Sequence, residues 1–184
     1  GHDMSREYNV LSKLNTSFNK VPKTYIYNDD LSILNCPFYV MEMIDGIILT
    51  GKEANKRNIK ADDFGKISKV WLETFVELHS LDYKSIGLEN LGRPKGYIDR
   101  QIEIWSFQYN IAKTTEIKSA DKVIKWLYKN KPSSQNTSLI HNDYKYDNVV
   151  FKDENWNRIN SILDWEMCTI GDPLMDLGTS IAYW

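Results

Sequence analysis

The chain has 184 residues, enough for one domain with a continuous core and too few for two domains of ordinary size. Its 23 Lys and Arg residues against 25 Asp and Glu residues give a formal net charge of -2, which excludes the basic field that nucleic-acid binding usually requires. Two cysteines without a CxxC partner, a polar amino end and no apolar run of roughly 18 residues predict a cytoplasmic protein without a membrane partner.

The first half of the chain predicts a helix, two strands and a longer helix. Residues 4 to 14 place apolar side chains along one face, with Asp3 as a candidate N-cap. Residues 24 to 27 and 38 to 44 are rich in β-branched and aromatic residues on either side of a turn-forming stretch, so we expect neighbouring strands. From residue 62 to residue 79 apolar side chains recur at helical intervals, which predicts the longest helix.

The second half predicts two more helices, from residue 97 to about 113 and from residue 120 to 129. Three short apolar runs then predict strands at residues 138 to 140, 149 to 151 and 159 to 163. The turn-rich segment between the last two predicts a hairpin. Strands first, helices in the middle and a late hairpin form an α+β order rather than a series of alternating βαβ units.

A polar cluster lies between the first two of these late strands. It is the run HNDYKYDN, residues 141 to 148, and Asp164 follows the third strand. Phosphoryl transfer needs a hydroxyl held in line, an acceptor for its proton and cations that offset the charge of the phosphate oxygens. Asp143 is the candidate proton acceptor, and Lys145 could place positive charge near the moving group. Asn148 and Asp164 offer the hard oxygen donors that Mg²⁺ prefers.

The spacing supports this interpretation, because Asp143 and Asn148 are five residues apart, as in the catalytic loop of kinases. The predicted hairpin would return Asp164 to the neighbourhood of Asn148. For Asp143 the alternative is a solvated loop acid, and for Lys145 it is a surface lysine. We include His141 among the candidate catalytic residues, although a structural role, with the ring bonded to loop backbone, is the preferred interpretation.

Five longer stretches carry a family resemblance: HDMSREYNVLSKL, CPFYVMEMIDG, GYIDRQIEIWSFQY, LIHNDYKYDNVVF and ILDWEMCTIGDPLMDLG. Together they resemble the aminoglycoside phosphotransferase and choline kinase superfamily, particularly its branch associated with acyl-CoA dehydrogenases. The resemblance covers nearly the whole chain. It implies a protein-kinase-like fold, with a partial N-terminal lobe in residues 1–44 and most of a helical C-terminal lobe in residues 45–184.

The resemblance also implies ATP and Mg²⁺ as cofactors, with Asp143 as the base and Asn148 and Asp164 as the metal ligands. By position, Glu7 resembles the helix acid that pairs with an ATP-binding lysine, with a surface pair to Arg6 as the alternative. The hinge whose backbone would meet adenine corresponds to Glu42, Met43 and Ile44.

Two features depart from the family pattern. The glycine-rich phosphate loop and the lysine strand should precede Gly1, and further helices should follow Trp184, so we expect an internal piece of a longer kinase that is inactive alone. Asn142 stands where the family usually has glycine. Its larger side chain is expected to alter the loop backbone or its contact with the acceptor.

The leading functional hypothesis is an ATP-dependent phosphotransferase that acts on a hydroxyl of a small metabolite. The dehydrogenase association suggests a hydroxyacyl-CoA acceptor, ahead of an aminoglycoside or a choline-type alcohol, and a fused or associated acyl-CoA dehydrogenase as partner. One alternative is a kinase-shaped binding module that does not turn over. Another is a metal-dependent phosphoesterase, which would need more metal-binding side chains than this cluster offers.

Several nearby residues can be explained by structural roles. Asp172 is the expected N-cap of a last helix that starts with Pro173. Asp176 either favours the positive end of that helix or, as the resemblance suggests, braces the loop from a buried position. His79 is expected to cap the longest helix. Trp105 lies on a helix that could face the acceptor, but its helical spacing favours a core position.

Overall fold

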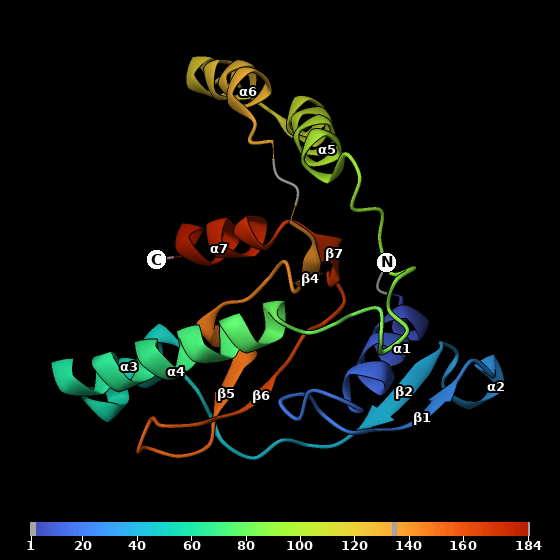
Figure 1. Cartoon of the computed structure of the whole chain (residues 1–184), viewed down its shortest axis with the longest axis vertical. Coiled ribbons are helices and arrows are strands. Elements are labelled where there is room, and N and C mark those ends of the chain that lie inside the picture. Colours follow the sequence, from blue (N-terminus) through green and yellow to red (C-terminus); the bar gives the residue numbers. More distant parts are fainter. Residues whose placement is uncertain (1–2, 134–135, 184) are drawn as a thin grey trace.

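The computed structural model describes residues 3–133 and 136–183. This part of the chain contains seven α-helices and three small antiparallel sheets (Figure 1). The helices are α1 Met4–Leu14, α2 Leu31–Leu34, α3 Gly51–Arg57, α4 Ala61–His79, α5 Tyr97–Ala112, α6 Lys118–Asn130 and α7 Pro173–Ala182. The strands are β1 Thr24–Asn28, β2 Phe38–Met41, β3 Ile47–Ile48, β4 Ser138–Ile140, β5 Val149–Phe151, β6 Ile159–Ile162 and β7 Thr169–Gly171.

Helix α1 has the bounds that the sequence predicts. The Asp3 side chain caps it by accepting a hydrogen bond from the backbone N–H of Arg6 at 3.0 Å. On the face toward the first sheet, the ring of Tyr8 lies 5.6 Å from that of Tyr27 on β1. The apolar face of α1 belongs to the main core through Val10, Leu11 and Leu14.

Strand β2 is shorter than the strand predicted over residues 38 to 44, because it ends at Met41. Thr24, the first residue of β1, pairs with Met41, and the N–H of Glu42 then donates to the carbonyl of Lys23 at 2.7 Å. A strand continues only where a neighbouring strand can bond its backbone groups. The extension to Ile44 is therefore wrong, and residues 42 to 44 form a connection.

The other two sheets hold the late strands of the chain. The predicted hairpin is confirmed as β5 and β6, and β3 pairs along the other edge of β5. Strand β4 pairs with β7 in a separate two-stranded sheet. Strands β3 and β7 are absent from the prediction, because these short segments become strands only by pairing with β5 and β4, which are distant in sequence.

Helix α4 carries the apolar stripe that the sequence predicts, and it packs against β4 and β6. Two of its aromatic residues, Trp71 and Phe75, stack with ring centroids 5.5 Å apart. Tyr144 packs on both rings, and its hydroxyl donates to the carbonyl of Trp71 at 3.0 Å. Because Tyr144 belongs to the predicted catalytic segment, this core contact fixes that segment to α4.

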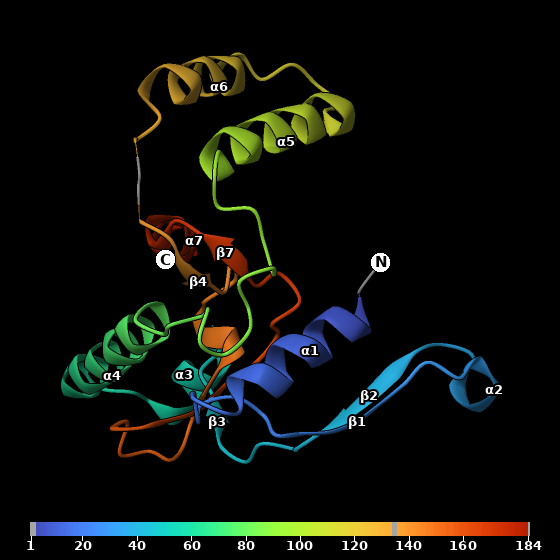
Figure 2. The ribbon, with the colours of Figure 1, turned by 45° about the vertical axis from the view of Figure 1, so that its right-hand side comes forward.

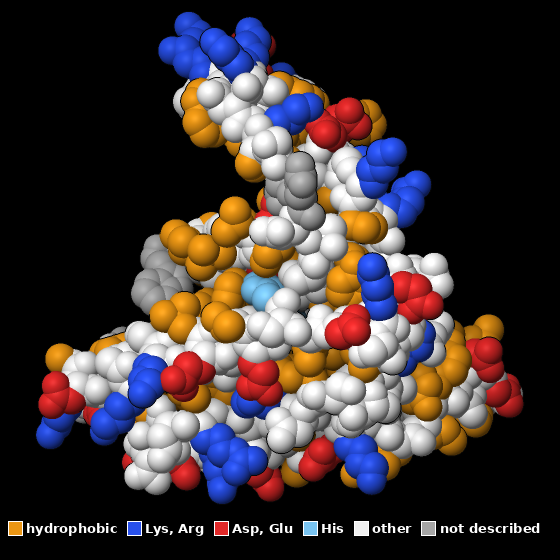
Figure 3. All heavy atoms as spheres, in the orientation of Figure 1, with side chains coloured by type: hydrophobic (Ala, Val, Ile, Leu, Met, Phe, Trp, Pro, Cys, Tyr) orange, Lys and Arg blue, Asp and Glu red, His pale blue; other side chains and the backbone are white. Residues whose placement is uncertain are grey.

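Helices α5 and α6 lie side by side beyond α7, away from α4 and the β5–β6 hairpin (Figures 1 and 2). Helix α6 buries none of its residues, and Trp105 on α5 is 60% exposed. The prediction that Trp105 packs in the core is therefore wrong. Figure 3 shows apolar side chains over α7 and basic side chains at the outer end of α6. Within the described ranges, no helix combines the length and the apolar character needed to cross a membrane.

The turn before β3 requires glycine. Gly46 has a φ of +151°, and an added Cβ would lie 2.4 Å from the carbonyl oxygen of Phe151. We therefore expect Gly46→Ala to lower the free energy of unfolding by about 2 kcal/mol or more, through strain and backbone overlap. Gly65→Ala is the matched control. A methyl added at Gly65, within α4, meets open space, so we expect the free energy of unfolding to rise by about 0.5–1 kcal/mol. Urea unfolding measures both, and equal effects would contradict the prediction.

Candidate active site

Three predicted residues meet in the segment that connects β4 to β5, which we call the Asp143 loop (residues 141–148). The Nζ of Lys145 lies 3.0 and 2.8 Å from the two carboxylate oxygens of Asp143. The side-chain amide of Asn148 donates to Oδ2 of Asp143 at 2.8 Å and to its backbone carbonyl at 2.9 Å. The hydrogen bonds that the Lys145 ammonium donates to Asp143 raise the pKa of Lys145, so this side chain stays positively charged at neutral pH.

His141 is buried, and backbone groups occupy both of its ring nitrogens. Its Nδ1 accepts the N–H of Asp143 at 3.3 Å, and its Nε2 lies 3.0 Å from the carbonyl of Leu163. Burial lowers the pKa of His141, so the ring is neutral at physiological pH and donates through Nε2. This environment supports the structural interpretation of His141, because neither nitrogen faces a substrate.

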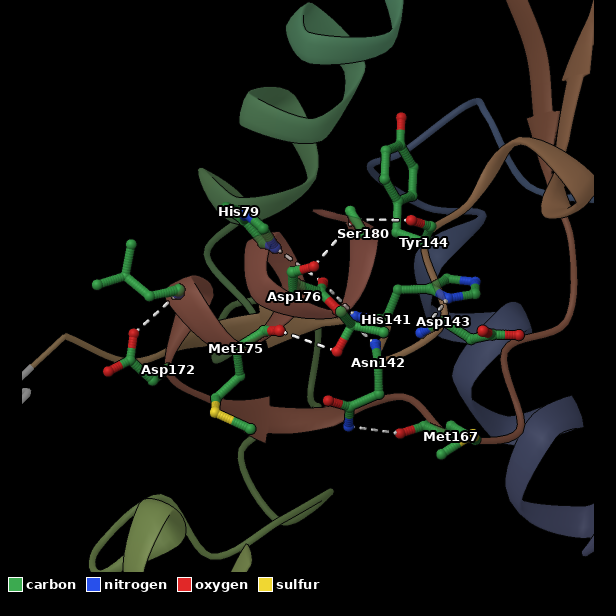
Figure 4. Close-up of polar contacts among 12 residues, drawn as sticks. His79, His141, Asn142, Asp143, Tyr144, Met167, Asp172, Met175, Asp176 and Ser180 are labelled. Atoms are coloured by element: carbon green, nitrogen blue, oxygen red, sulfur yellow. Dashed lines mark hydrogen bonds and ion pairs between the residues drawn. The ribbon is translucent and has the colours of Figure 1, made fainter. Parts of the chain in front are cut away.

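The carboxylate of Asp176 on α7 holds the start of the Asp143 loop (Figure 4). Its Oδ2 accepts the backbone N–H of His141 at 2.7 Å, and its Oδ1 accepts that of Asn142 at 2.5 Å. The Nε2 of His79, the last residue of α4, lies 2.9 Å from Oδ2. Asp176 is fully buried, so the interpretation as a brace is confirmed.

The sequence does not predict the role of His79. The expected role is to cap α4, whereas the ring reaches a carboxylate that lies 97 residues later in the chain. No local pattern indicates a partner at that separation. The clue lies only in the types of the two residues, since a buried carboxylate needs donors.

Asp164 lies where the predicted hairpin should deliver it. It follows β6, and the N–H of the preceding Leu163 donates to the carbonyl of Asn148 at 2.8 Å. Asp164 is exposed and has a φ of +66°, which turns the chain sharply at this point. The backbone therefore brings the two candidate metal ligands next to each other.

The donor set fits a magnesium ion. Because the amide nitrogen of Asn148 is committed to Asp143, the amide oxygen is the atom this side chain can offer to a cation. A hard cation that bridges phosphates needs few protein oxygens beyond this amide and the carboxylate of Asp164. Among the residues the structure describes, no group of three or more His, Cys, Asp and Glu side chains could hold a metal.

Glu7 reaches the same region from α1. Its Oε1 accepts the N–H of Trp165, the residue after Asp164, at 3.0 Å. Burial and the neighbouring Glu7 carboxylate raise the pKa of Tyr39 on β2. Arg6 turns the other way and donates to the carbonyls of Leu91 and Cys168, so the surface pair between Arg6 and Glu7 is not formed.

The predicted hinge residues lie in the connection between β2 and β3. Glu42 exchanges hydrogen bonds with Lys23, through its N–H at 2.7 Å and through Oε2 at 3.2 Å. Met43 is 86% exposed and Ile44 is partly buried. Their connection leads into β3, whose partner β5 directly follows Asn148.

Asp143 opens onto a cavity of about 500 Å³ between α5, α7 and the segment that leads into β7. Asp143 is the one acid among the described residues that line this cavity. The other lining residues are mostly large and apolar or carry hydroxyls and amides: Tyr97, Gln101, Trp105, Asn142, Met167, Thr169, Met175, Thr179 and Tyr183. A small organic molecule could therefore present a hydroxyl to Asp143 from this side.

Comparison with known proteins identifies the family of this chain. A model of the "Phosphotransferase enzyme family" matches residues 2–184. The chain belongs to this phosphotransferase family. It is 34% identical over 190 residues to acyl-CoA dehydrogenase family member 11 of Gallus gallus and 33% identical over 189 residues to family member 10 of Mus musculus. It covers 100% of its own length in both matches, and 23% and 17% of those proteins.

Solved structures confirm the α+β, protein-kinase-like fold. A putative aminoglycoside phosphotransferase from Ralstonia eutropha superposes with a TM-score of 0.89 at 32% identity, over 98% of this chain and 55% of that one. An aminoglycoside phosphotransferase solved with streptomycin and ATP superposes with a TM-score of 0.61, over 94% of this chain and 57% of that one. At 20% identity, the second likeness shows the fold alone.

Replacing the bracing carboxylate tests its importance for the loop. We expect Asp176→Asn to lower the free energy of unfolding by about 2–4 kcal/mol, because an amide cannot accept all three buried donors. Asp99→Asn, which removes an exposed carboxylate paired with Lys131 on the surface of α5, is the matched control and should have little effect. Similar urea midpoints for both variants would contradict the role of Asp176.

The neutral ring of His141 predicts a pH dependence. Its folded pKa lies below the unfolded value of about 6.5, so its contribution to stability is complete above that value and is lost as the pH falls through the folded pKa. We expect the free energy of unfolding to fall more steeply from pH 7 to pH 5 in the wild type than in His141→Gln. Urea unfolding at a series of pH values measures both slopes, and equal slopes would refute this assignment.

Proposed function

We propose that the protein transfers the γ-phosphoryl group of ATP to a hydroxyl of a small metabolite. The observation that carries this proposal is the position of Asp143, which shares hydrogen bonds with Lys145 and Asn148 and opens onto a cavity for a small molecule. This combination of a base, a cation and an amide oxygen meets the needs of phosphoryl transfer.

In the proposed reaction, Asp143 orients the acceptor hydroxyl and takes its proton. The acceptor oxygen forms a bond to the γ-phosphorus, the bond from that phosphorus to the bridging oxygen breaks, and ADP leaves with the electron pair. Lys145 holds the Asp143 carboxylate in place before the transfer and can turn toward the developing charge, since its chain is flexible and only partly buried. Asp143 acts within the cavity wall, where water is partly excluded.

We propose that Asn148 and Asp164 hold Mg²⁺. The bound ion would neutralise phosphate charge and orient the transferred group. We further propose that the backbone of Glu42, Met43 and Ile44 meets adenine and that Glu7 orients an ATP-binding lysine. The Glu7 contact with the N–H of Trp165 supports the last assignment, because Trp165 directly follows the proposed metal ligand Asp164. The division of the chain into lobes at residue 44 stays a prediction.

For the acceptor we propose a hydroxyacyl-CoA. Two curated relatives are named as acyl-CoA dehydrogenase family members, and the cavity beside Asp143 has apolar walls formed by Trp105, Met167 and Met175. A polycationic aminoglycoside would require more acids than the single carboxylate in this lining. An associated acyl-CoA dehydrogenase would then act on the same class of acyl chain.

A second candidate is a kinase-shaped module without turnover. It is favoured by one contact, since Lys145 engages both carboxylate oxygens of the proposed base. An assay of the isolated chain distinguishes the two candidates. The chain is incubated with Mg²⁺, labelled ATP and a hydroxyacyl-CoA. Phosphorylated acceptor would contradict the silent module, and transfer only by a longer protein that contains this chain would show that further segments are required.

Replacing the proposed base should abolish transfer. We expect Asp143→Asn to lower kcat by roughly 10²–10⁴-fold, because the amide cannot accept the hydroxyl proton. Asp147→Asn removes an exposed carboxylate from the same loop and serves as the matched control. Both are measured in the complete protein that carries this chain, with labelled ATP and a hydroxyacyl-CoA. Retention of most of the wild-type rate by Asp143→Asn would refute the base assignment.

A further inference from the structure

Asn142, which precedes the proposed base, has a left-handed backbone with a φ of +65°. Asn tolerates this conformation better than most residues, although glycine adopts it with less strain. If backbone conformation were the only demand, glycine would suit the position better. The side chain must therefore be judged by the contacts that it makes.

The Asn142 side chain joins two segments that are distant in sequence, and Figure 4 shows its contact with Met167. Its Nδ2 donates to the carbonyl of Met167 at 2.9 Å, and its Oδ1 accepts the hydroxyl proton of Tyr97 at 3.2 Å. Its backbone N–H is held by Asp176 at 2.5 Å. One residue thus connects α5, α7 and the segment between Asp164 and β7 at the point where the chain turns into Asp143.

The position of Tyr97, which donates one of these hydrogen bonds, is fixed by its surroundings. Its side chain is buried, and burial raises its pKa, so the hydroxyl keeps its proton and remains a donor at neutral pH. The ring fits against β7 only because residue 171 is glycine. A Cβ at Gly171 would lie 2.9 Å from Cε1 of Tyr97 and 2.6 Å from Cδ1 of Ile140. Tyr97, the first residue of α5, is therefore fixed by packing at the base of that helix.

The same residues enclose the proposed acceptor space. Tyr97, Asn142, Asp143 and Met167 all line the cavity of about 500 Å³. The outer part of α5 has few contacts with the body, because α5 and α6 lie beyond α7 (Figure 2). The hydrogen bond from Tyr97 to Asn142 is a direct polar contact between α5 and the Asp143 loop.

We infer that Asn142 is a positioning residue that, through Tyr97 and the Met167 carbonyl, fixes the Asp143 carboxylate relative to α5 and so sets where the acceptor hydroxyl must enter. Asn142 does not touch the reacting atoms in this arrangement. It acts through the orientation of the adjacent residue and through the distance between the cavity wall and the base. The kinetic consequence of this inference rests on the proposed phosphotransfer, whereas its structural consequence does not.

The test uses Asn142→Gly, Tyr97→Phe and the double variant. Asn142→Gly keeps the left-handed backbone and removes both side-chain bonds, and Tyr97→Phe removes one bond without changing the loop. Asn58→Gly is the matched control, since Asn58 also has a left-handed φ, of +49°, but lies at the end of α3. Tyr128→Phe on α6 controls for the loss of an exposed tyrosine hydroxyl.

Amide hydrogen exchange of residues 141–149 gives a readout that does not depend on activity. We expect exchange in this segment to accelerate in Asn142→Gly and in Tyr97→Phe, with no acceleration in either control. The double variant should exchange no faster than Asn142→Gly, because the two changes break the same link. Unchanged exchange in both single variants, or equal acceleration in Asn58→Gly, would overturn the inference.

The kinetic readout uses the complete protein with ATP and a hydroxyacyl-CoA. We expect kcat to fall roughly tenfold in Asn142→Gly, with an unchanged KM for ATP, because a misplaced base slows the transfer without disturbing the nucleotide. A general loss of folding would also lower the apparent kcat at an unchanged KM, so the rates are compared per folded protein, with the folded fraction measured by circular dichroism. If exchange accelerates while kcat stays at the wild-type value, Asn142 does not position the base and the inference fails. If the wild type transfers no phosphate, the proposed function fails and the exchange result alone decides whether Asn142 fixes the loop.

Discussion

The site depends on the hydrogen bonds that the Asp176 carboxylate accepts from the Asp143 loop. This carboxylate lies buried on α7 and binds two successive backbone N–H groups, those of His141 and Asn142, together with the ring of His79. A buried charge is tolerated only when such donors surround it, so the same requirement that stabilises the carboxylate also fixes the loop. Through these contacts, α7, α4 and β4 fix the first end of the Asp143 loop. The hydrogen bond from the N–H of Leu163 to the carbonyl of Asn148 fixes its other end.

Beyond α7, on the side of α5 and α6, the molecule is less tightly packed. Helices α5 and α6 contact each other and enclose apolar space, and their exposed aromatic side chains contrast with the filled core under α4. The cavity beside Asp143 lies at the boundary between the two regions.

Much of the fold follows from local patterns. The bounds of α1, α4 and the β5–β6 hairpin agree with the periodicity of the sequence because each segment buries a continuous apolar face. The short strands β3 and β7 and the early end of β2 could not be predicted, because backbone pairing with distant segments decides them. Trp105 shows the opposite failure: its helical spacing indicates a core position, yet the partner face is open.

The sequence by itself determined the residue types of the candidate site, their order and the spacing between Asp143 and Asn148, since these depend only on the covalent chain. It also placed Asp164 after a hairpin, which a turn-rich segment between two apolar runs specifies locally. Only the tertiary structure decided that His79 reaches Asp176, that Glu7 meets the turn after Asp164, and that Tyr97 bonds to Asn142. Each of these contacts joins residues separated by 45 or more positions, and their proximity arises from packing of whole elements rather than from any local preference.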